Sequence, residues 1–558
     1  MKLKRLLLEN YCSLKRTEID FDPSINVIIG KNNVGKSSIL TAISLMAELG
    51  RESTEKSRPH PAIASRGGFL NLVFGHDDSL DISICSDIEL QDEEAVGQEL
   101  SVDGAPTRPM TSLVFEVALE ANNNVKPVVR YDVESGGHID VDFSGDSMVD
   151  TGGSGIKFDQ PRLVRCWDKV RWLDASRVPE HETAAQGTDR LAPDGQNLVQ
   201  LLNAIASSNA RLFSAIEAGV RQIIPEISSV RAPLRSGSST AYGATSERYF
   251  PDLEFAWPSL AAGTKQVICL LTFIYSSPRS SILLIEEPEI HLHPDAVMKL
   301  IRVCEEVSES QDKQFVFSTH SPLLCELVGL RRAIVVTRDH ENGDSRVQSL
   351  VQFAMAEKVL KRSGLGASQM LVSAKGAKTA PDFVLVCEGK TDKAIWTALI
   401  GRGGVNTSRV KIVEHDGGWQ ESIRVGMLLR ILNDVGTICV PFVVLLDSDN
   451  KSGAKQAEAK RAGLSEDEYH VLAEKEIESY LLDADAIADA LGLDQPAVKK
   501  AIAAKRGRGG KSRLDKTLSE FGVRATDRGI LAAIAERIPL NDELVNILNT
   551  IASEIDSS

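Results

Sequence analysis

The pattern of hydrophobic and polar positions predicts a strand, a glycine-bearing loop and a helix at the start of the chain. Residues 3–30 alternate between apolar and polar side chains and end in the apolar run INVIIG. The following segment, KNNVGKSSILTAISLMAEL, switches to helical periodicity. Residues 55–160 carry short β-type runs (LVFEVALE, KPVVRYDV and HIDVDF) between Gly, Asp and Ser residues, so we expect antiparallel strands there.

Two further stretches of alternating strands and helices follow. The first is expected to contain the strand VRWLDASR, a helix over 195–227, the loop SGSSTAYGATS, a helix over 259–275, the strand SILLIEE, a helix over 294–309, and the strands QFVFSTH and AIVVTR. The second is expected to contain the strand FVLVCEG, the helix TDKAIWTALI, the strand VKIVEHDGG, the helix ESIRVGMLLRIL, the strand VPFVVLLDSD and then mostly helices. Such alternation is typical of parallel sheets, so the predicted fold class is α/β.

Composition and charge narrow the possible functions. The chain has 558 residues, enough for roughly three or four domains. Its 63 basic and 78 acidic residues give a net charge of −15, which excludes a wholly basic nucleic-acid-binding protein. Eight cysteines without a C-x-x-C pair indicate free thiols in a reducing compartment. No apolar run approaches the roughly 18 residues of a membrane span, so we expect a cytoplasmic protein with no membrane partner.

A candidate nucleotide site lies between the first predicted strand and helix. Residues 30–37, GKNNVGKS, fit the pattern G-x-x-x-x-G-K-[ST], in which backbone N–H groups surround the phosphates. The lysine would reach the β- and γ-phosphate oxygens, and the serine would offer its hydroxyl to Mg²⁺. The alternative, a glycine-rich turn without a ligand, is disfavoured by the flanking strand and helix. The predicted ATP-binding residues here are Gly30, Asn32, Asn33, Gly35, Lys36, Ser37 and Ser38.

The acidic partners of this site are predicted at the end of the strand SILLIEE. Glu286 would help to hold Mg²⁺ and Glu287 would orient the attacking water, because ligands of parallel sheets bind at the carboxyl ends of the strands. The next residues, PEIHLHP, and the later STHS with His320 resemble the D-loop and switch histidine of ABC-type ATPases. Two surface glutamates and a core histidine are the alternative, which the order of the three motifs disfavours.

Residues 259–266, SLAAGTKQ, resemble the signature segment through which ABC-type ATPases contact the nucleotide of a second protomer. Gly263 and Thr264 are its predicted nucleotide-binding residues. Ala262 stands where that family usually has serine, so one donor to the γ-phosphate is missing. The resemblance therefore implies slow turnover, or a nucleotide that acts as a switch.

A second candidate site lies in the last α/β stretch. Glu388 follows the strand FVLVC and Asp392 comes four residues later, whereas Asp447 and Asp449 follow the strand FVVLL. Acids at the ends of two strands of one parallel sheet converge at its edge and can bind one or two Mg²⁺ or Mn²⁺ ions, the arrangement that supports phosphodiester cleavage. This ordered pair, EG-x-x-D and then D-x-D, is similar to the signature of TOPRIM domains.

Two later features add candidate residues. EKEIESYLL at 474–482 resembles a stretch of TOPRIM units fused to ATPases and offers Glu478 as a further metal ligand, with a solvated helix face as the alternative. Residues 498–516 hold eight basic residues and one acidic residue, a net of +7, and could follow a DNA backbone. Lys511 is the candidate for supporting the scissile phosphate, and disordered surface charge is the alternative.

Taken together, these motifs resemble the OLD (overcoming lysogenization defect) family of ATP-dependent endonucleases. The resemblance implies an ABC-type, RecF/SMC-like P-loop ATPase over 1–180 and 250–355, with a helical dimerisation insert over 181–249. It further implies a linker over 356–380 and a Rossmann-like TOPRIM nuclease domain with a helical extension over 381–558. Family members commonly act in anti-phage defence, alone or with a partner protein or a retron reverse transcriptase and its RNA/DNA.

The sequence therefore predicts a homodimeric, ATP-regulated and metal-dependent DNA endonuclease or nickase. An SMC/RecF-like ATP-dependent DNA-binding or sensor protein, whose TOPRIM domain does not cut, is the alternative. A topoisomerase or primase is disfavoured because no room remains for a strand-passage scaffold. The predicted catalytic residues are Glu287, His320, Glu388, Asp392, Asp447, Asp449 and Lys511, and the predicted metal ligands are Ser37, Glu286, Glu388, Asp392, Asp447, Asp449 and Glu478.

Overall fold

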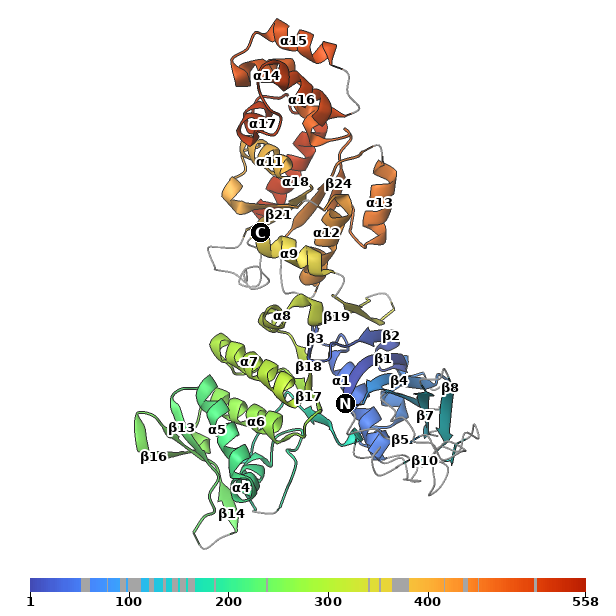
Figure 1. Ribbon diagram of the computed structural model, residues 1–558, viewed down its shortest axis with the longest axis vertical. Coiled ribbons are helices and arrows are strands. Elements are labelled where there is room, and N and C mark those ends of the chain that lie inside the picture. The colour runs from blue at the N-terminus through green and yellow to red at the C-terminus, as the bar shows by residue number, and fades with distance from the viewer. Residues whose placement is uncertain are drawn as a thin grey trace. The chain divides into compact units, whose positions relative to one another are not determined.

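The computed structural model divides the chain into two compact units, Met1–Leu350 and Val351–Ser558 (Figure 1). The structure describes residues 1–51, 61–77, 79–90, 97–98, 112–119, 125–133, 137–142, 149–150, 157–158, 166–184, 187–236, 239–339, 342–350, 353–363, 381–415, 417–434, 440–449, 451–505 and 509–557.

The first unit is organised around a six-stranded sheet with the order β11-β17-β18-β3-β19-β20. Its strands are β11 (Val170–Leu173), β17 (Ile282–Glu286), β18 (Gln314–Thr319), β3 (Ile25–Ile29), β19 (Ala333–Arg338) and β20 (Ser345–Ser349). All neighbouring strands are parallel except β19 and β20. The carboxyl ends of β3, β17 and β18, which lead into the P-loop, Glu287 and His320, therefore lie at one edge of the sheet. The sheet is accompanied by helices α1 (Lys36–Arg51), α6 (Ala262–Ser276), α7 (Pro294–Gln311) and α8 (Pro322–Val328). The α/β class predicted from the alternating pattern is confirmed.

A second, antiparallel sheet packs on helix α1. Its order is β2-β1-β4-β6-β7-β8-β9, as the β-type runs before residue 160 predicted. The strands are β1 (Lys2–Tyr11), β2 (Leu14–Asp20), β4 (Ile82–Glu89), β6 (Ser112–Leu119), β7 (Val125–Val133), β8 (Gly137–Asp142) and β9 (Val149–Asp150). The short helix α2 (Pro61–Ala64) contacts α1, and β5 (Gly97–Gln98) and β10 (Lys157–Phe158) pair with each other in a separate two-stranded sheet. One hydrophobic core joins α1 to side chains of both sheets, so the P-loop helix is clamped between them.

The segment predicted as a helical insert is a mixture of helices and strands. It contains β12 (Glu182–Ala184), α4 (Leu198–Ser208), α5 (Ala210–Ile223), β13 (Ile227–Arg231), β14 (Thr240–Tyr242) and β15 (Ala244–Glu247), and β16 (Phe250–Ala256) follows it directly. The expected single helix is broken at Asn209, whose side chain accepts a hydrogen bond from Leu212 N and begins α5. The loop expected at SGSSTAYGATS is wrong, because β14 pairs with β12 and β15 lies between β13 and β16. Small and polar side chains do not prevent a strand when distant segments supply its hydrogen-bond partners.

The second unit contains a parallel four-stranded sheet with the order β22-β21-β23-β24. Its strands are β21 (Phe383–Cys387), β22 (Val410–Glu414), β23 (Phe442–Leu446) and β24 (Tyr469–Val471), and its helices are α9 (Ala354–Arg362), α11 (Lys390–Arg402), α12 (Trp419–Asp434), α13 (Ser452–Arg461), α14 (Ala484–Leu491), α15 (Gln495–Ala504), α16 (Gly510–Glu520), α17 (Arg528–Ala535) and α18 (Asp542–Ser557). The segment expected as a linker from residue 356 begins inside α9, which packs on α12, and residues 364–380 lie outside the described part.

Glu543 anchors the last helix of this unit. Its carboxylate accepts hydrogen bonds from the Tyr480 hydroxyl and from Ala473 N at 2.9 Å, and it pairs with His470 Nε2 at 2.7 Å. Burial acts to raise the pKa of Glu543, but the hydrogen bonds from Tyr480, His470 and Ala473 outweigh it and lower the pKa. The carboxylate therefore joins α18 to the sheet and to the turn that follows it.

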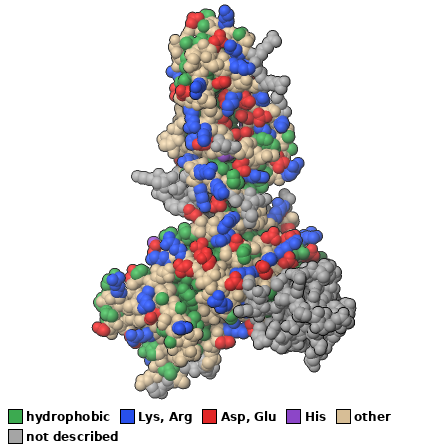
Figure 2. Space-filling model, in the orientation of Figure 1, with side chains coloured by type: hydrophobic (Ala, Val, Ile, Leu, Met, Phe, Trp, Pro, Cys, Tyr) green, Lys and Arg blue, Asp and Glu red, His purple; other side chains and the backbone are tan. Residues whose placement is uncertain are grey.

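The charged surface, the cysteines and the helices agree with what the composition predicted. Lys/Arg and Asp/Glu side chains are interspersed over the visible face in Figure 2. The seven cysteines in the described part are free thiols, as expected; Cys439 lies outside it. Among the helices of the described residues, none is both long and apolar enough to span a lipid bilayer.

Candidate functional site

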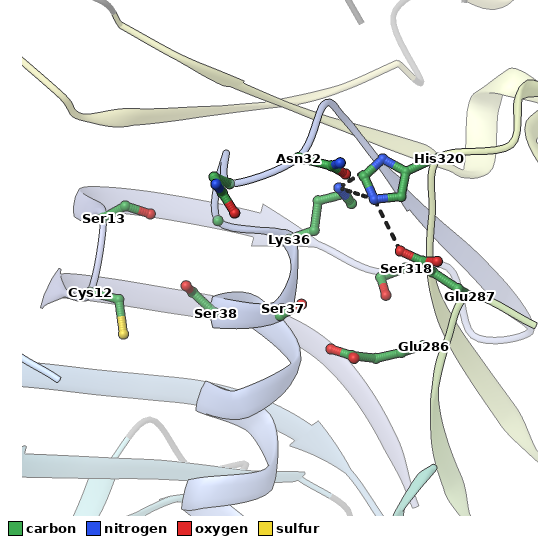
Figure 3. Close-up of a pocket in the computed structure, with 12 residues that line it drawn as sticks. Cys12, Ser13, Asn32, Lys36, Ser37, Ser38, Glu286, Glu287, Ser318 and His320 are labelled. Atoms are coloured by element: carbon green, nitrogen blue, oxygen red, sulfur yellow. Dashed lines mark hydrogen bonds and ion pairs between the residues drawn. The ribbon is translucent and has the colours of Figure 1, made fainter. Parts of the chain in front are cut away.

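The first unit holds a cavity of about 530 Å³ at the carboxyl edge of its parallel sheet (Figure 3). It is bounded by the P-loop, by the end of β17, by the end of β18 and by the turn between β1 and β2. A volume of this size suits a small-molecule ligand. The lining residues are Cys12, Ser13, Asn32, Asn33, Gly35, Lys36, Ser37, Ser38, Glu286, Glu287, Ser318 and His320. The predicted P-loop residues other than Gly30, both glutamates and the histidine thus line one cavity. The two residues from the β1–β2 turn had no signal in the sequence.

Lys36 is folded back onto its own loop. Its ammonium donates to Gly30 O at 2.9 Å and to Lys31 O at 2.8 Å, and it lies 3.1 Å from His320 Nε2. Burial lowers the pKa of Lys36 to about 8, although the nearby glutamates oppose this shift. The positive charge of the Lys36 ammonium is therefore only partly neutralised by its neighbours, and a bound anion would stabilise it.

Two glutamates and a histidine line the cavity near Lys36, and the histidine contacts it (Figure 3). His320 Nε2 lies 3.0 Å from Glu287 Oε1. Burial, and then the Lys36 ammonium, lower the pKa of His320, so the imidazole is neutral at pH 7. Burial raises the pKa of Glu286, and a hydrogen bond from the Ser37 side chain opposes it. Glu286 therefore lies beside the P-loop serine that was predicted to share a magnesium ion with it.

Arg177, which the sequence analysis did not single out, holds the backbone of both glutamates. Its buried guanidinium donates to Glu286 O at 2.7 Å, to Glu287 O at 2.9 Å and to Gln266 Oε1 at 2.5 Å. Glu287 has a positive φ of 40°, which a residue with a side chain adopts only when its surroundings impose it. Arg177 thus holds both helix α6, through Gln266, and the backbone of Glu286 and Glu287.

The signature segment is at the start of α6. A Cβ atom on Gly263 would come within 2.6 Å of His291 O, so only glycine fits against the turn after β17. Of the residues described, Gly263 and Thr264 are not among those lining the cavity of Figure 3. Their predicted contact with the nucleotide of a second protomer stays a prediction.

The carboxylates of the second unit come from elements that end at one edge of its sheet. Glu388 directly follows β21, Asp392 lies in the first turn of α11, and Asp447 directly follows the adjacent strand β23. The turn Ile477–Leu481 approaches the same edge, because Ile477 N donates to Asp447 Oδ1 at 3.1 Å. Glu478 in this turn is 3% exposed, so it does not lie on a solvated helix face.

These carboxylates are close enough to change one another's ionisation. Burial, and then the charges of Asp392, Glu388 and Glu478, raise the pKa of Asp447 to about 8. Burial also raises the pKa values of Glu388 and Glu478, which Lys455 and Lys511 respectively oppose. We call Glu388, Asp392, Asp447, Asp449 and Glu478 the acid cluster.

Two lysines lie against the acid cluster. Lys511 Nζ is 3.3 Å from Glu478 Oε1, and Lys511 N donates to Glu476 Oε2 at 2.8 Å. The close approach needs Gly510, since a Cβ atom there would meet Ser479 Cα at 2.6 Å. Lys455, which the sequence analysis did not single out, lies on the other side, next to Asp449. Across the described residues, no three or more His, Cys, Asp or Glu side chains form a ready-made metal site.

Comparisons with known proteins find ATPase family models and nucleases among the similar sequences. A family model described as "AAA ATPase domain" matches residues 1–126, and an "AAA domain" model, whose description also names the AbiEii toxin of a type IV TA system, matches residues 208–326. The Old nuclease of Escherichia phage P2 is 22% identical over 510 residues, which cover 82% of this chain and 79% of that protein. The OLD nuclease of Thermus scotoductus is 25% identical over 222 residues.

This chain resembles the OLD nucleases over most of its length.

The other similarities are shorter or more distant. The match to the Thermus nuclease spans 39% of this chain and 40% of that protein. The DNA replication and repair protein RecF of Lactobacillus acidophilus is 38% identical over 76 residues, which are 14% of this chain and 20% of RecF. Among solved structures, an SMC head bound to the C-winged helix domain of ScpA covers 63% of this chain and 99% of its own, with 12% identity and a TM-score of 0.41. The chain thus spans less than half the length of the first two of these relatives.

Proposed function

We propose that this chain is a member of the OLD family: an ATP-regulated, divalent-metal-dependent DNA endonuclease or nickase, and an effector of anti-phage defence. The observation that carries the proposal is the acid cluster, in which burial, and then the charges of Asp392, Glu388 and Glu478, raise the pKa of Asp447 to about 8. Buried carboxylates that repel one another are costly unless a cation joins them. We further propose that the chain acts in the cytoplasm as a homodimer through its ATPase unit, alone or with a partner protein or retron reverse transcriptase.

The chemistry of the acid cluster fits a divalent ion. Hard cations such as Mg²⁺ and Mn²⁺ prefer carboxylate oxygens. In the described part of the chain, Glu388 Oε1 and Glu478 Oε1 are buried, and each faces an ammonium group, that of Lys455 at 3.5 Å and that of Lys511 at 3.3 Å. Both oxygens thus already face positive charge, and a divalent ion would bind at the same place. The residues that would hold the ion are Glu388, Asp392, Asp447, Asp449 and Glu478. A bound ion would supply an activated water and charge stabilisation for phosphodiester cleavage. Lys511 would neutralise the scissile phosphate from the side of Glu478.

The cavity of the first unit fits a nucleotide. The P-loop N–H groups and Lys36 would bind the phosphates, and Ser37 with Glu286 would hold Mg²⁺. ATP would supply the γ-phosphoryl group for hydrolysis. Glu287 would orient a water, and His320, 3.0 Å from Glu287, would hold that carboxylate in place. The Lys36 ammonium, now bonded to two carbonyls of its own loop, would turn to the phosphates.

One observation favours the alternative, an ATP-dependent DNA-binding or sensor protein whose second unit does not cut. Lys455 and Lys511 already lie beside carboxylates of the acid cluster, and no ready-made metal site is formed by the described residues. Ammonium groups could then serve as permanent counter-charges. Metal-dependent cleavage decides between the two functions.

The test is cleavage of supercoiled plasmid with Mg²⁺ or Mn²⁺, with and without ATP. The expected result is cleavage that Asp447→Asn abolishes and that Lys36→Met changes only when ATP is present. Asp467→Asn and Lys15→Met are the matched controls, because both residues are exposed and lie outside either site. Cleavage by Asp447→Asn at the wild-type rate would refute the nuclease centre. Absence of cleavage in every protein, with ATP hydrolysis lost in Lys36→Met, would favour the sensor.

A further inference from the structure

The second unit contains another cavity, between helices α11 and α17, which pack side by side (Figure 1). Its volume is about 810 Å³, and we call it the α11–α17 groove. The residues that line it are Lys390, Lys393, Ala394, Thr397, Ala398, Gly401, Arg402, Thr407, Arg528, Ala532 and Glu536. They belong neither to the acid cluster nor to the nucleotide cavity, so the proposed function leaves this groove without a role.

Small side chains keep the α11–α17 groove open. Its α11 residues recur at the i, i+3 and i+4 spacing of one helix face, and its α17 residues follow one another at the i, i+4 spacing. Four of the lining residues have little or no side chain, namely Ala394, Ala398, Gly401 and Ala532. Space therefore remains between the two helices, and an elongated ligand can approach them closely.

The charge of the α11–α17 groove is positive. Four of its lining residues are cations, Lys390, Lys393, Arg402 and Arg528, whereas Glu536 is the one acid among them. Their formal charges add to +3, in a chain whose net charge is −15. A groove lined by one sign of charge attracts ligands of the opposite sign, so this part of an acidic protein favours an anion.

One end of the α11–α17 groove lies at the edge of the sheet that carries the acid cluster. Lys390 is the first residue of α11, two positions before Asp392 of the acid cluster. Lys393 pairs at 2.5 Å with Glu414, the last residue of β22, which lies beside the end of β21. From Lys390 to Arg402 the helix is about 18 Å long, so the groove extends from the acid cluster along the length of α11.

We propose that the α11–α17 groove binds the sugar-phosphate backbone of DNA beside the point of cleavage. This inference rests on the proposed function, in which the acid cluster at one end of the groove cuts the DNA. Phosphates of one strand of a B-form duplex are spaced by about 3.4 Å along the axis, so the length of α11 corresponds to about five of them. The four cations neutralise phosphates, and such contacts position a duplex without reading its sequence.

The test is the binding of a fluorescently labelled DNA duplex by the full-length protein, measured over a range of KCl concentrations at constant Mg²⁺. All proteins carry Asp447→Asn, so that the duplex stays intact. Each phosphate contact contributes up to about 0.9 to the slope of log affinity against log salt. Arg528→Gln should therefore bind about three- to eightfold more weakly at about 0.1 M KCl, with a shallower slope. Thr397→Glu, which places a carboxylate in the groove, should also bind more weakly.

Two matched controls lie on other helices of the same unit. Arg461→Gln removes an exposed arginine of α13 that pairs with Glu458. Thr550→Glu alters an exposed threonine of α18 whose hydroxyl, like that of Thr397, donates to the carbonyl four residues earlier. Both controls should bind DNA as the parent protein does. Equal weakening in the controls would mean a general effect of charge and would overturn the proposal.

A variant of opposite sign separates lost contacts from a damaged fold. Glu536→Gln removes the one acid that lines the groove and should tighten DNA binding by about two- to fivefold, which an unfolded protein cannot do. With Asp447 restored, Arg528→Gln should raise the KM for plasmid cleavage and leave kcat unchanged, because the acid cluster is intact. Unchanged affinity and slope in Arg528→Gln and Thr397→Glu, with cleavage still dependent on Asp447, would overturn the groove alone. If none of the proteins binds DNA, the proposed function fails together with this inference.

Discussion

Metal binding at the acid cluster should release a proton, because Asp447 carries one in the metal-free protein. With a pKa of about 8, Asp447 is about 0.9 protonated at pH 7 and about 0.1 protonated at pH 9. A divalent ion requires the carboxylate form, so binding at pH 7 should release about 0.9 proton and binding at pH 9 about 0.1. Buffers of different ionisation enthalpy measure this number directly, since each released proton adds the buffer's heat to the heat of binding.

The same pKa predicts how stability depends on pH in EDTA. The folded protein binds the Asp447 proton more tightly than the unfolded chain, whose Asp pKa is near 3.9, so the favourable contribution is complete below about pH 4 and lost as pH rises through about 8. Relative to Asp447→Asn, which does not titrate, wild type should lose about 1.4 kcal/mol of unfolding free energy per pH unit inside this window. Between pH 5 and 7 the difference is therefore about 2–3 kcal/mol.

Two results would refute this reasoning. Heats of Mn²⁺ binding at pH 7 that are the same in all buffers would mean that Asp447 is already ionised without metal. A stability difference between wild type and Asp447→Asn that is constant from pH 5 to 7 would mean the same. Asp467→Asn is the control for a carboxylate removed from an exposed position, and it should change neither measurement.

Three further predictions follow from single side chains. Arg177→Lys cannot reach all the carbonyls that Arg177 holds, so Glu287 should be displaced while the P-loop stays intact. The variant should lower kcat for ATP hydrolysis by about 10- to 100-fold with little change in KM. A change confined to KM in steady-state kinetics would contradict this prediction. Lys313 is fully buried, and burial lowers its pKa to about 7. Lys313→Met should therefore raise the unfolding free energy by about 1–3 kcal/mol at pH 7. The gain should be smaller toward pH 10, where the lysine of the unfolded chain also begins to lose its proton. A variant less stable than wild type in chemical denaturation at pH 7 would contradict this prediction. Glu543→Gln should destabilise the second unit by about 1–3 kcal/mol at pH 7, since the hydrogen bond from Tyr480 is then made to a neutral group. The pKa of Glu543 is lowered in the folded protein, so its contribution to stability is present above the pKa of the unfolded chain and is lost as the pH falls. Calorimetry should therefore find a smaller difference in stability between the variant and wild type near pH 3.

Much of the fold and most candidate residues could be predicted from the chain because the signals are local. Apolar runs such as Ile282–Ile285 and Phe442–Leu446 identify buried strands, and parallel strands bring the residues after them to one edge of a sheet. The glycine pattern at 30–37 fixes a loop and a helix start by short-range geometry. Sequence order was therefore enough to predict that Lys36, Glu286 and His320 approach one another.

The remaining features depend on contacts between distant segments. The strand pairs β12–β14 and β13–β15 arise from pairing across the fold, not from apolar alternation in SGSSTAYGATS. Lys455 belongs to a helix whose composition suggests a solvated surface, and its burial is tolerated because carboxylates from β21 and β23 surround its ammonium. Arg177 likewise finds its acceptors on β17 and α6. The free energy of a buried charge is set by its neighbours in space, so only the tertiary structure decided which cations of this acidic chain hold its two sites in place.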